Sequence, residues 1–260
     1  MSRSGVSVIV PAYNEGSALG HALEALEAGL APLQARYAVE LLVVDDGSTD
    51  ETPQTLARFT AERGDGVKII VHEVNRGLTE AMKTGTRAAR GRITVFMDAD
   101  LSYAPPIVER LVAALERDGA SAVLASPYMR GGRVANVPFD RLIASRGANL
   151  LLAACVGFRL HTFTGMVRAY DTAALREIIE QPVRGEFNAW VVAEFLRAGK
   201  PVVEIPAALI WPPARTQAPS RMSAAKLRAR TQLVVQTIAV LLAARRKVPL
   251  RSGPQSGPKS

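Results

Sequence analysis

Short apolar runs alternate with amphipathic stretches through the first half of the chain. The apolar runs are rich in Val, Ile and Leu and stop at Pro, Asp or Gly, which is typical of buried strands. They predict strands at residues 6–10, 40–44, 67–72, 93–97 and 122–125. Apolar positions three or four apart, or capping residues, predict helices at residues 18–28, 50–62, 78–89 and 107–117. This alternation predicts an α/β fold with a mostly parallel sheet covered by helices on both faces.

The pattern becomes less regular after Tyr128. The sequence predicts a loop at residues 131–132, a long helix at 139–154, strands near 164–169 and 202–205, and helices near 173–179 and 190–198. A loop at 211–220 and a helix at 224–246 follow. We expect one folded domain over residues 1–223, an apolar helix between basic residues over 224–250, and a disordered Gly/Pro/Ser-rich tail over 251–260.

The composition of the chain excludes several classes of protein and site. The chain has 260 residues, of which 48% are hydrophobic and 22% charged, and this is the composition of an ordinary globular protein rather than a disordered one. A single cysteine, Cys155, excludes a disulfide framework and a cysteine-based zinc site. Residues 1–5 carry no apolar run of the kind that a secretory signal needs, so we expect a reducing, cytoplasmic setting.

The net charge of +8 comes from the C-terminal segment. Residues 205–260 contain ten Lys or Arg and no Asp or Glu, whereas residues 1–204 have a net charge of −2. Such a segment suits an anionic partner, such as nucleic acid, a membrane surface or an anionic substrate, or is simply a solvated tail. Its apolar window, residues 233–244, is shorter than the ~18–20 residues that span a bilayer. It suits an interfacial anchor, a core helix or a partner-binding helix equally well.

Polar residues follow three of the predicted strands. They are P-A-Y-N-E at residues 11–15, D-D-G-S at 45–48 and D-A-D at 98–100. Because ligands of open parallel sheets bind beyond the carboxyl ends of the strands, we expect these residues to share one rim. The two carboxylates of D-A-D repel each other unless a cation lies beside them, and Mg²⁺ suits such oxygens together with substrate phosphates. Neither the P-loop motif nor the dinucleotide-binding fingerprint is present.

These strings together resemble the family 2 glycosyltransferases, which have the GT-A fold. The resemblance rests on V-S-V-I-V-P-A-Y-N-E (6–15), V-V-D-D-G-S-T-D-E-T (43–52), N-R-G-L (75–78) and F-M-D-A-D-L (96–101). Four further strings resemble the dolichol-phosphate mannose synthase branch. They are Y-M-R-G-G-R-V-A-N-V-P-F-D-R (128–141), S-R-G-A-N (145–149), F-T-G-M-V-R-A-Y (163–170) and S-R-M-S (220–223). The match covers roughly residues 5–225.

The resemblance implies a nucleotide-sugar site, with roles carried over residue by residue. It places the base and ribose on Pro11, Tyr13, Glu15 and Asp46, with Asp45 a lesser contact, and the closing loop at Arg76 and Gly77. Ala99 lies between Asp98 and Asp100, the two carboxylates that would hold Mg²⁺ or Mn²⁺ against the diphosphate. The cation would stabilise the charge that develops as the sugar bond breaks.

The implied reaction is inverting transfer of a hexose, with mannose favoured, from the nucleotide diphosphate to a polyprenyl phosphate. An acceptor phosphate is already anionic, so no strong general base is needed. This agrees with the absence of an obvious histidine–carboxylate pair, and we expect His21, His72 and His161 to be surface or structural residues. Basic residues should hold the phosphates. The candidates are Arg130, Arg141, Arg146, Arg215 and Arg221, although a solvated helix face would also explain Arg141 and Arg146.

Three departures from the family pattern bear on the acceptor and the metal. Ser102 stands where the family often has a metal-binding Gln, Pro127 where it has an Arg, and His161 where it has an Asp. Two alternatives therefore remain: a soluble glycosyltransferase acting on a small molecule or saccharide, and a weakly active scaffold subunit. We expect as partners a nucleotide sugar, a polyprenyl phosphate and an anionic membrane surface, with no nucleic acid. The expected location is cytoplasmic, peripheral at the cytoplasmic face of the membrane.

Overall fold

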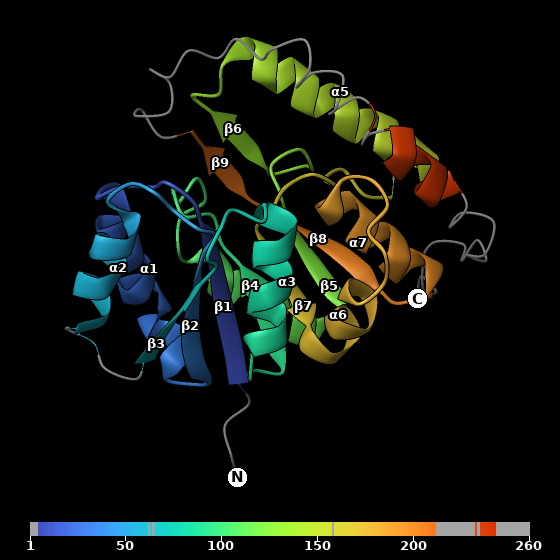
Figure 1. The fold of residues 1–260 in the computed structure, drawn as a ribbon. Coiled ribbons are helices and arrows are strands. Elements are labelled where there is room, and N and C mark those ends of the chain that lie inside the picture. The colour runs from blue at the N-terminus through green and yellow to red at the C-terminus, as the bar shows by residue number, and fades with distance from the viewer. Residues whose placement is uncertain are drawn as a thin grey trace.

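A seven-stranded sheet forms the centre of the structure. The structure is a computed structural model, and it describes residues 5–61, 63, 66–157, 159–211, 232 and 235–242. The strand order is β3-β2-β1-β4-β7-β5-β8 (Figure 1). The strands are β1 (Gly5–Ala12), β2 (Ala38–Asp45), β3 (Val67–Val71), β4 (Ile93–Phe96), β5 (Ala122–Ser126), β7 (Arg168–Asp171) and β8 (Val202–Pro206). Only β7 runs antiparallel to its neighbours, β4 and β5, so the prediction of a mostly parallel sheet is confirmed.

Helices cover both faces of the sheet (Figure 1). They are α1 (Ala18–Gln34), α2 (Thr52–Ala61), α3 (Leu78–Ala88), α4 (Ile107–Arg117), α5 (Phe139–Cys155), α6 (Thr172–Ile179) and α7 (Phe187–Arg197). Apolar side chains of α1, α2 and α4 share one core cluster, and those of α3, α6 and α7 share another. A small parallel pair, β6 (Arg133–Ala135) and β9 (Ala208–Ile210), lies with α5 on the side of the sheet to which the carboxyl ends of the parallel strands point (Figure 1).

The central strands are apolar throughout because both of their faces are buried. In β1, Val8 and Val10 belong to the cluster under α1 and α4, whereas Ile9 between them belongs to the cluster under α3. In β2, Val43 and Val44 divide between the two clusters in the same way. This two-sided burial explains why unbroken apolar runs, rather than alternating ones, mark these strands in the sequence.

Four elements differ from the sequence prediction. Helix α1 continues to Gln34 because Leu30 and Leu33 extend its buried face. Strand β7 begins at Arg168 rather than near residue 164, because the backbone N–H groups of residues 163 and 164 donate to the side chain of Asn149 instead of to a neighbouring strand. Strands β6 and β9 were not predicted, since three residues are too few to show a strand pattern.

Part of the C-terminal segment packs against the domain. Residues 235–242 are helical, and Leu241 is fully buried in a cluster with Leu152 of α5 and Val192 of α7. The backbone N–H of Glu186 donates to Thr237 Oγ1 at 3.0 Å. Within residues 235–242, Leu241 packs as a core side chain, whereas Val235 and Leu242 are exposed. Several predicted parts lie outside the described residues. They are the loop at 211–220 after Trp211, residues Leu233 and Val234, and the tail at 251–260.

No helix among the described residues is both long enough and apolar enough to cross a membrane.

Candidate active site

The three polar strand ends meet on one rim of the sheet, as the sequence predicts. Strands β2, β1 and β4 are parallel neighbours, and Asp45 pairs with Ala12 across β2 and β1. The backbone N–H of Met97 donates to Ile9 O at 2.9 Å, which keeps the chain beside β1 up to Asp98. The loops that begin at Tyr13, Asp46 and Asp98 therefore leave the sheet side by side.

The loops after β1 and β2 are tied to each other. Asn14 N–H donates to Ser48 Oγ at 3.0 Å, and Thr49 N–H donates to Asn14 Oδ1 at 2.9 Å. Asn14 has a φ of 53°, a left-handed conformation that Asn tolerates better than most residues. Pro11 is buried, and Glu15 N–H donates to Thr52 Oγ1. Tyr13 is 44% exposed, so the loop after β1 presents an aromatic ring at the rim on which a planar base can stack.

Asp46 is 3% exposed, and its carboxylate faces the loop that precedes α3. Oδ1 accepts the backbone N–H of Arg76 at 3.0 Å, and Oδ2 accepts that of Gly77 at 2.7 Å. His72 Nδ1 lies 2.7 Å from Oδ1. Gly77 has a φ of 88°, which favours glycine, and Arg76 extends a largely exposed guanidinium from this loop. Asp46 thus anchors the N-R-G segment to the rim.

Asp45 lies deeper than Asp46. It is fully buried, its Oδ1 accepts the backbone N–H of Ser48 at 3.0 Å, and its Oδ2 is a buried oxygen with no hydrogen-bond partner among the described residues. The Ser48 bond shapes the turn after β2, as an aspartate at such a position commonly does.

The D-A-D segment follows β4. Asp98 and Asp100 are partly exposed residues, Ala99 between them is buried, and Oδ2 of Asp100 is itself a buried oxygen. Asp100 Oδ1 accepts the backbone N–H of Ser102 at 3.0 Å and its hydroxyl at 2.7 Å, so Ser102 fixes the orientation of this carboxylate. Leu101 has a φ of 50°, which is strained for a branched side chain. The strain lies directly beside the two carboxylates.

The donor set of this segment fits a hard divalent cation. Both side chains offer carboxylate oxygens, which Mg²⁺ and Mn²⁺ prefer. The part of the chain that the structure describes has no cluster of three or more His, Cys, Asp or Glu suited to a metal. A cation here would therefore complete its coordination with diphosphate oxygens and water, as Mg²⁺ commonly does. Burial, and secondarily the nearby Asp98 charge, raises the pKa of Tyr103, so its hydroxyl stays protonated.

A second layer lies over the D-A-D segment and carries Arg141. The backbone N–H of Ile210 donates to Ser102 O at 2.8 Å, which places the end of β9 beside the D-A-D loop. Trp211 follows, and its ring lies 5.2 Å from the guanidinium carbon of Arg141 on α5. This short chain of contacts links a cation of α5 to the carboxylates of β4.

The other predicted cations are less closely tied to the rim. The Arg146 guanidinium lies 5.9 Å from the Tyr128 ring, and the Tyr128 hydroxyl lies 2.7 Å from Ser145 Oγ. Arg130 is exposed in the turn before β6. Arg215 and Arg221 lie outside the described residues.

The segment at residues 161–165 is held from three sides, which the sequence did not indicate. Asn149 Oδ1 accepts the N–H of Phe163 at 2.6 Å, and the buried Arg168 donates to the Phe163 carbonyl. The Glu204 carboxylate accepts the backbone N–H groups of residues 161 and 162 at 2.7–2.9 Å. Gly165 brings this segment next to Tyr103, three residues after the D-A-D motif. It therefore forms a fixed wall of the rim.

Two histidine–carboxylate pairs that are not obvious in the sequence are present in the structure. His72 pairs with Asp46 at 2.7 Å, and His161 pairs with Glu204 at 2.8 Å. These partners are distant in the sequence, and therefore no spacing could reveal them. His72 Nε2 also lies 2.9 Å from Thr84 Oγ1, so both ring nitrogens contact the protein itself. A structural role for His72 agrees with this geometry.

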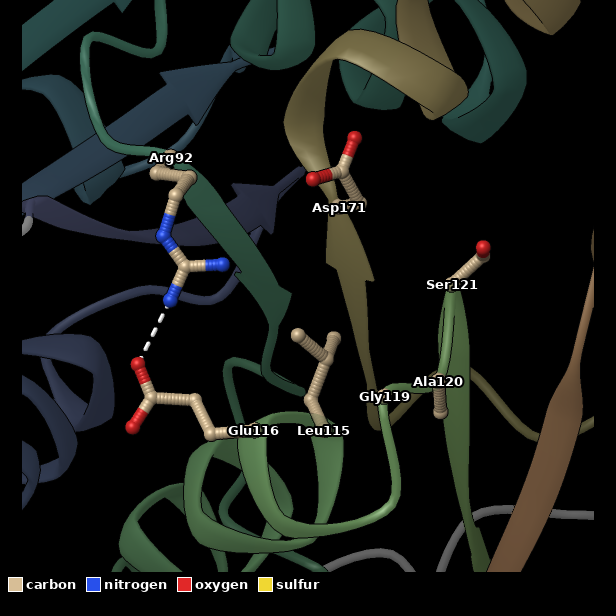
Figure 2. Close-up of a pocket in the computed structure, with 7 residues that line it drawn as sticks. All are labelled: Arg92, Leu115, Glu116, Gly119, Ala120, Ser121 and Asp171. Carbon is tan, nitrogen blue, oxygen red and sulfur yellow. Dashed lines mark hydrogen bonds and ion pairs between the residues drawn. The ribbon is translucent and has the colours of Figure 1, made fainter.

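A cavity of about 450 Å³ lies at the opposite edge of the sheet, among the residues that precede β4 and β5 (Figure 2). Arg92 and Glu116 form an ion pair of 2.5 Å on its wall. None of the predicted site residues lines this cavity. The rim at the carboxyl ends therefore remains the candidate site.

Two curated proteins are similar to most of this chain. The dolichol-phosphate mannosyltransferase of Pyrococcus furiosus is 30% identical over 203 residues, which are 77% of this chain and 55% of that protein. The polyprenol monophosphomannose synthase of Mycolicibacterium smegmatis is 32% identical over 205 residues, 76% of this chain and 75% of that protein. The chain thus spans about half the length of the first of these relatives.

Among solved structures, a mannosyltransferase of Pyrobaculum calidifontis, in complex with GDP-mannose and Mn²⁺, superposes with a TM-score of 0.64 at 23% identity. The superposition covers 92% of this chain and 64% of that one, and it shows that the two share the GT-A fold. The sequence profile of glycosyl transferase family 2 matches residues 7–179, from the first strand to the end of α6. This chain belongs to glycosyl transferase family 2.

Proposed function

We propose that this protein transfers a hexose, with mannose favoured, from a nucleotide diphosphate sugar to a polyprenyl phosphate, with inversion at the anomeric carbon. The observation that carries the proposal is the shared rim. An exposed aromatic ring, a closing N-R-G loop and two metal-suited carboxylates stand on adjacent parallel strand ends. The names of the two sequence relatives, both of which describe mannose transfer or synthesis on a polyprenol-type phosphate, support this choice of substrates.

On this proposal, the donor lies along the rim from β2 to β4. The base stacks near Tyr13, between Pro11 and Glu15, and the diphosphate reaches Asp98 and Asp100. The Arg76 guanidinium is largely exposed, 3.9 Å from Glu80, and can pair with a phosphate. Asp46 Oδ2 accepts a hydrogen bond from the backbone N–H of Gly77, and a carboxylate oxygen can accept two, so it can also accept one from an N–H of the base.

The chemical step needs no base from the protein. An oxygen of the acceptor phosphate attacks the anomeric carbon, the bond to the diphosphate oxygen breaks, and the bonding electron pair leaves with the nucleoside diphosphate. A divalent cation held by Asp98 and Asp100 would stabilise the charge on that leaving group. Arg141 and Arg146 of α5 would orient the acceptor phosphate, because phosphate binding is a common use of arginine. Arg130, Arg215 and Arg221 are further candidates.

The membrane contact proposed here lies on α5 rather than on residues 235–242. Phe139, Ile143 and Leu150 are each more than half exposed, and their spacing of four and seven residues places them on one stripe of the helix. Arg146 falls on the same stripe. An exposed apolar stripe with a cation suits the interface of an anionic bilayer, where a lipid-borne phosphate would be found. On this proposal the protein acts at the cytoplasmic face of the membrane.

A test of the donor site is titration of the protein with GDP and with UDP, each with and without Mn²⁺. We expect one of the two nucleotides to bind at least tenfold more tightly when Mn²⁺ is present, because the cation links the diphosphate to Asp98 and Asp100. Binding that ignores Mn²⁺, or that is absent with both nucleotides, would contradict the proposed donor site.

Substituting Ile143→Asn and Leu150→Asn together should weaken binding to anionic vesicles about tenfold or more, because burial of each such side chain contributes about 1.5–3 kcal/mol. Cosedimentation with vesicles containing an anionic phospholipid measures this. Val71→Thr, an exposed apolar residue of β3, is the matched control and should not change the result. If the unaltered protein stays in the supernatant at low salt, α5 does not contact membranes.

A further inference from the structure

We infer that His72 is a positioning residue for nucleotide binding, acting through Asp46 on the N-R-G loop. The inference rests on the proposed function. It begins with the burial of His72, which is 6% exposed although it follows an edge strand, β3, whose last residue Val71 is largely exposed. A buried imidazole needs partners for both ring nitrogens. Asp46 and Thr84 supply them, at 2.7 and 2.9 Å.

The two contacts define how the ring is oriented. Because a carboxylate only accepts, Nδ1 must carry the proton that it donates to Asp46 Oδ1. In the neutral ring Nε2 is then the acceptor, and the Thr84 hydroxyl donates to it. Thr84 lies on α3, so the imidazole joins the end of β3 to the helix that follows the loop. The backbone N–H of His72 donates to Asp45 O at 2.9 Å, which fixes the residue against β2 as well.

The next contacts lead from Asp46 to the loop. Its carboxylate accepts the backbone N–H groups of Arg76 and Gly77, which are consecutive and are the last two residues before α3. Residues 73–76 are all exposed. Gly47 lies against the backbone of Val74 and Asn75, and the Arg76 guanidinium lies 3.9 Å from Glu80. The two bonds to Asp46 hold the end of the loop, so the direction of the Asp46 carboxylate affects where Arg76 lies.

Thr84, His72 and Asp46 thus form a series of contacts that positions Arg76. Without the imidazole, the Asp46 carboxylate loses a charge-assisted hydrogen bond and can rotate toward water. The loop then samples more conformations, and a nucleotide diphosphate must order it on binding. That ordering cost appears as weaker donor affinity, whereas the transfer step on bound donor changes little.

The experiment compares four single variants with the unaltered protein. His72→Ala removes both contacts. His72→Asn restores a donor near the Nδ1 position without reaching Thr84, and Thr84→Val removes the distal contact at nearly constant shape. His21→Ala, at an exposed position of α1, is the control for histidine removal. The readouts are GDP and UDP affinity with Mn²⁺, KM and kcat for the sugar donor, and hydrogen exchange of the Arg76 and Gly77 amides in the free protein.

We expect His72→Ala to weaken the affinity for the preferred nucleotide about tenfold or more and to raise KM with a smaller change in kcat. Exchange at the Arg76 and Gly77 amides should accelerate. His72→Asn should recover most of the nucleotide affinity. The affinity of Thr84→Val should lie between those of His72→Ala and the unaltered protein, and that of His21→Ala should equal the unaltered protein's. If His72→Ala fails to fold, the nucleotide affinities of His72→Asn and Thr84→Val, each compared with that of the unaltered protein, test the inference instead.

Several outcomes would overturn the inference. Unchanged nucleotide affinity and unchanged amide exchange in His72→Ala would show that His72 only contributes to stability. Equal affinity loss in His72→Asn and His72→Ala would show that the bond to Asp46 is not the cause. If the unaltered protein binds neither GDP nor UDP, the proposed function itself fails, and that result differs from a variant effect.

Discussion

Asp100→Asn is expected to lower turnover about a thousandfold while the fold is retained. Asparagine keeps the shape and can still accept from Ser102, but it lacks the negative charge that a divalent cation requires. Losing stabilisation of the leaving diphosphate costs several kcal/mol in the transition state, which corresponds to about 10²–10³ or more in rate. Asp98→Asn should be nearly as severe. Turnover at saturating donor and Mn²⁺, together with a thermal unfolding curve, measures both effects.

The matched control for Asp100→Asn is Asp118→Asn. Asp118 is an exposed carboxylate at the end of α4, paired with Arg117 and remote from the D-A-D motif. It should keep normal turnover. If Asp100→Asn retains more than about a tenth of the unaltered rate, or if chelation with EDTA leaves the unaltered enzyme active, then a cation at Asp98 and Asp100 does not carry the reaction.

Gly47→Ala is expected to disrupt both the loop and nucleotide binding. Gly47 follows Asp46, has a φ of 72°, and a Cβ added there would lie 2.4 Å from the backbone carbonyl carbon of Val74. The atoms that the added methyl group would meet belong to the backbone, which cannot rotate away as the end of a side chain can. Val74 and Asn75 would therefore be pushed from the rim. Arg76 and Gly77 would then lose their bonds to Asp46. We expect a loss of about 2–4 kcal/mol in the free energy of unfolding and at least a tenfold loss of GDP or UDP affinity.

Gly119→Ala separates the clash from the backbone strain. Gly119 also has a positive φ, 57°, but an added Cβ would meet nothing within 4 Å. It should lose only about 1 kcal/mol of stability and none of the nucleotide affinity. Denaturant unfolding and nucleotide titration compare the two. Equal effects of the two variants would show that the approach of Gly47 to Val74 does not organise the site.

Much of the fold is evident in the sequence because its local and global signals agree. Helix α4 has the bounds that its apolar period predicts, residues 107–117, since its buried face fits one helical stripe. The three polar strand ends fall on one rim because β2, β1 and β4 are parallel neighbours, and that follows from the strand–helix alternation.

What the sequence does not reveal depends on contacts between distant residues. The antiparallel insertion of β7 between β4 and β5 leaves no local pattern, because a strand buried on both faces has the same composition in either direction. His72 and Glu204 are isolated polar residues in or beside strands, and their partners lie 26 and 43 residues away. The roles of Asp46 and Asn149 toward neighbouring loops became visible only with those loops in place.

The central claim, that this rim moves a hexose onto a lipid phosphate, is tested most directly by the mass of the product. The full chain is incubated with Mn²⁺ and a polyprenyl phosphate, together with GDP-mannose or UDP-glucose, and the lipid fraction is analysed by mass spectrometry. The account predicts a polyprenyl phosphate heavier by one hexose, formed with at least one donor and absent with Asp100→Asn. Transfer that does not require the lipid phosphate, or no lipid product with either donor while the nucleotide still binds, would contradict it.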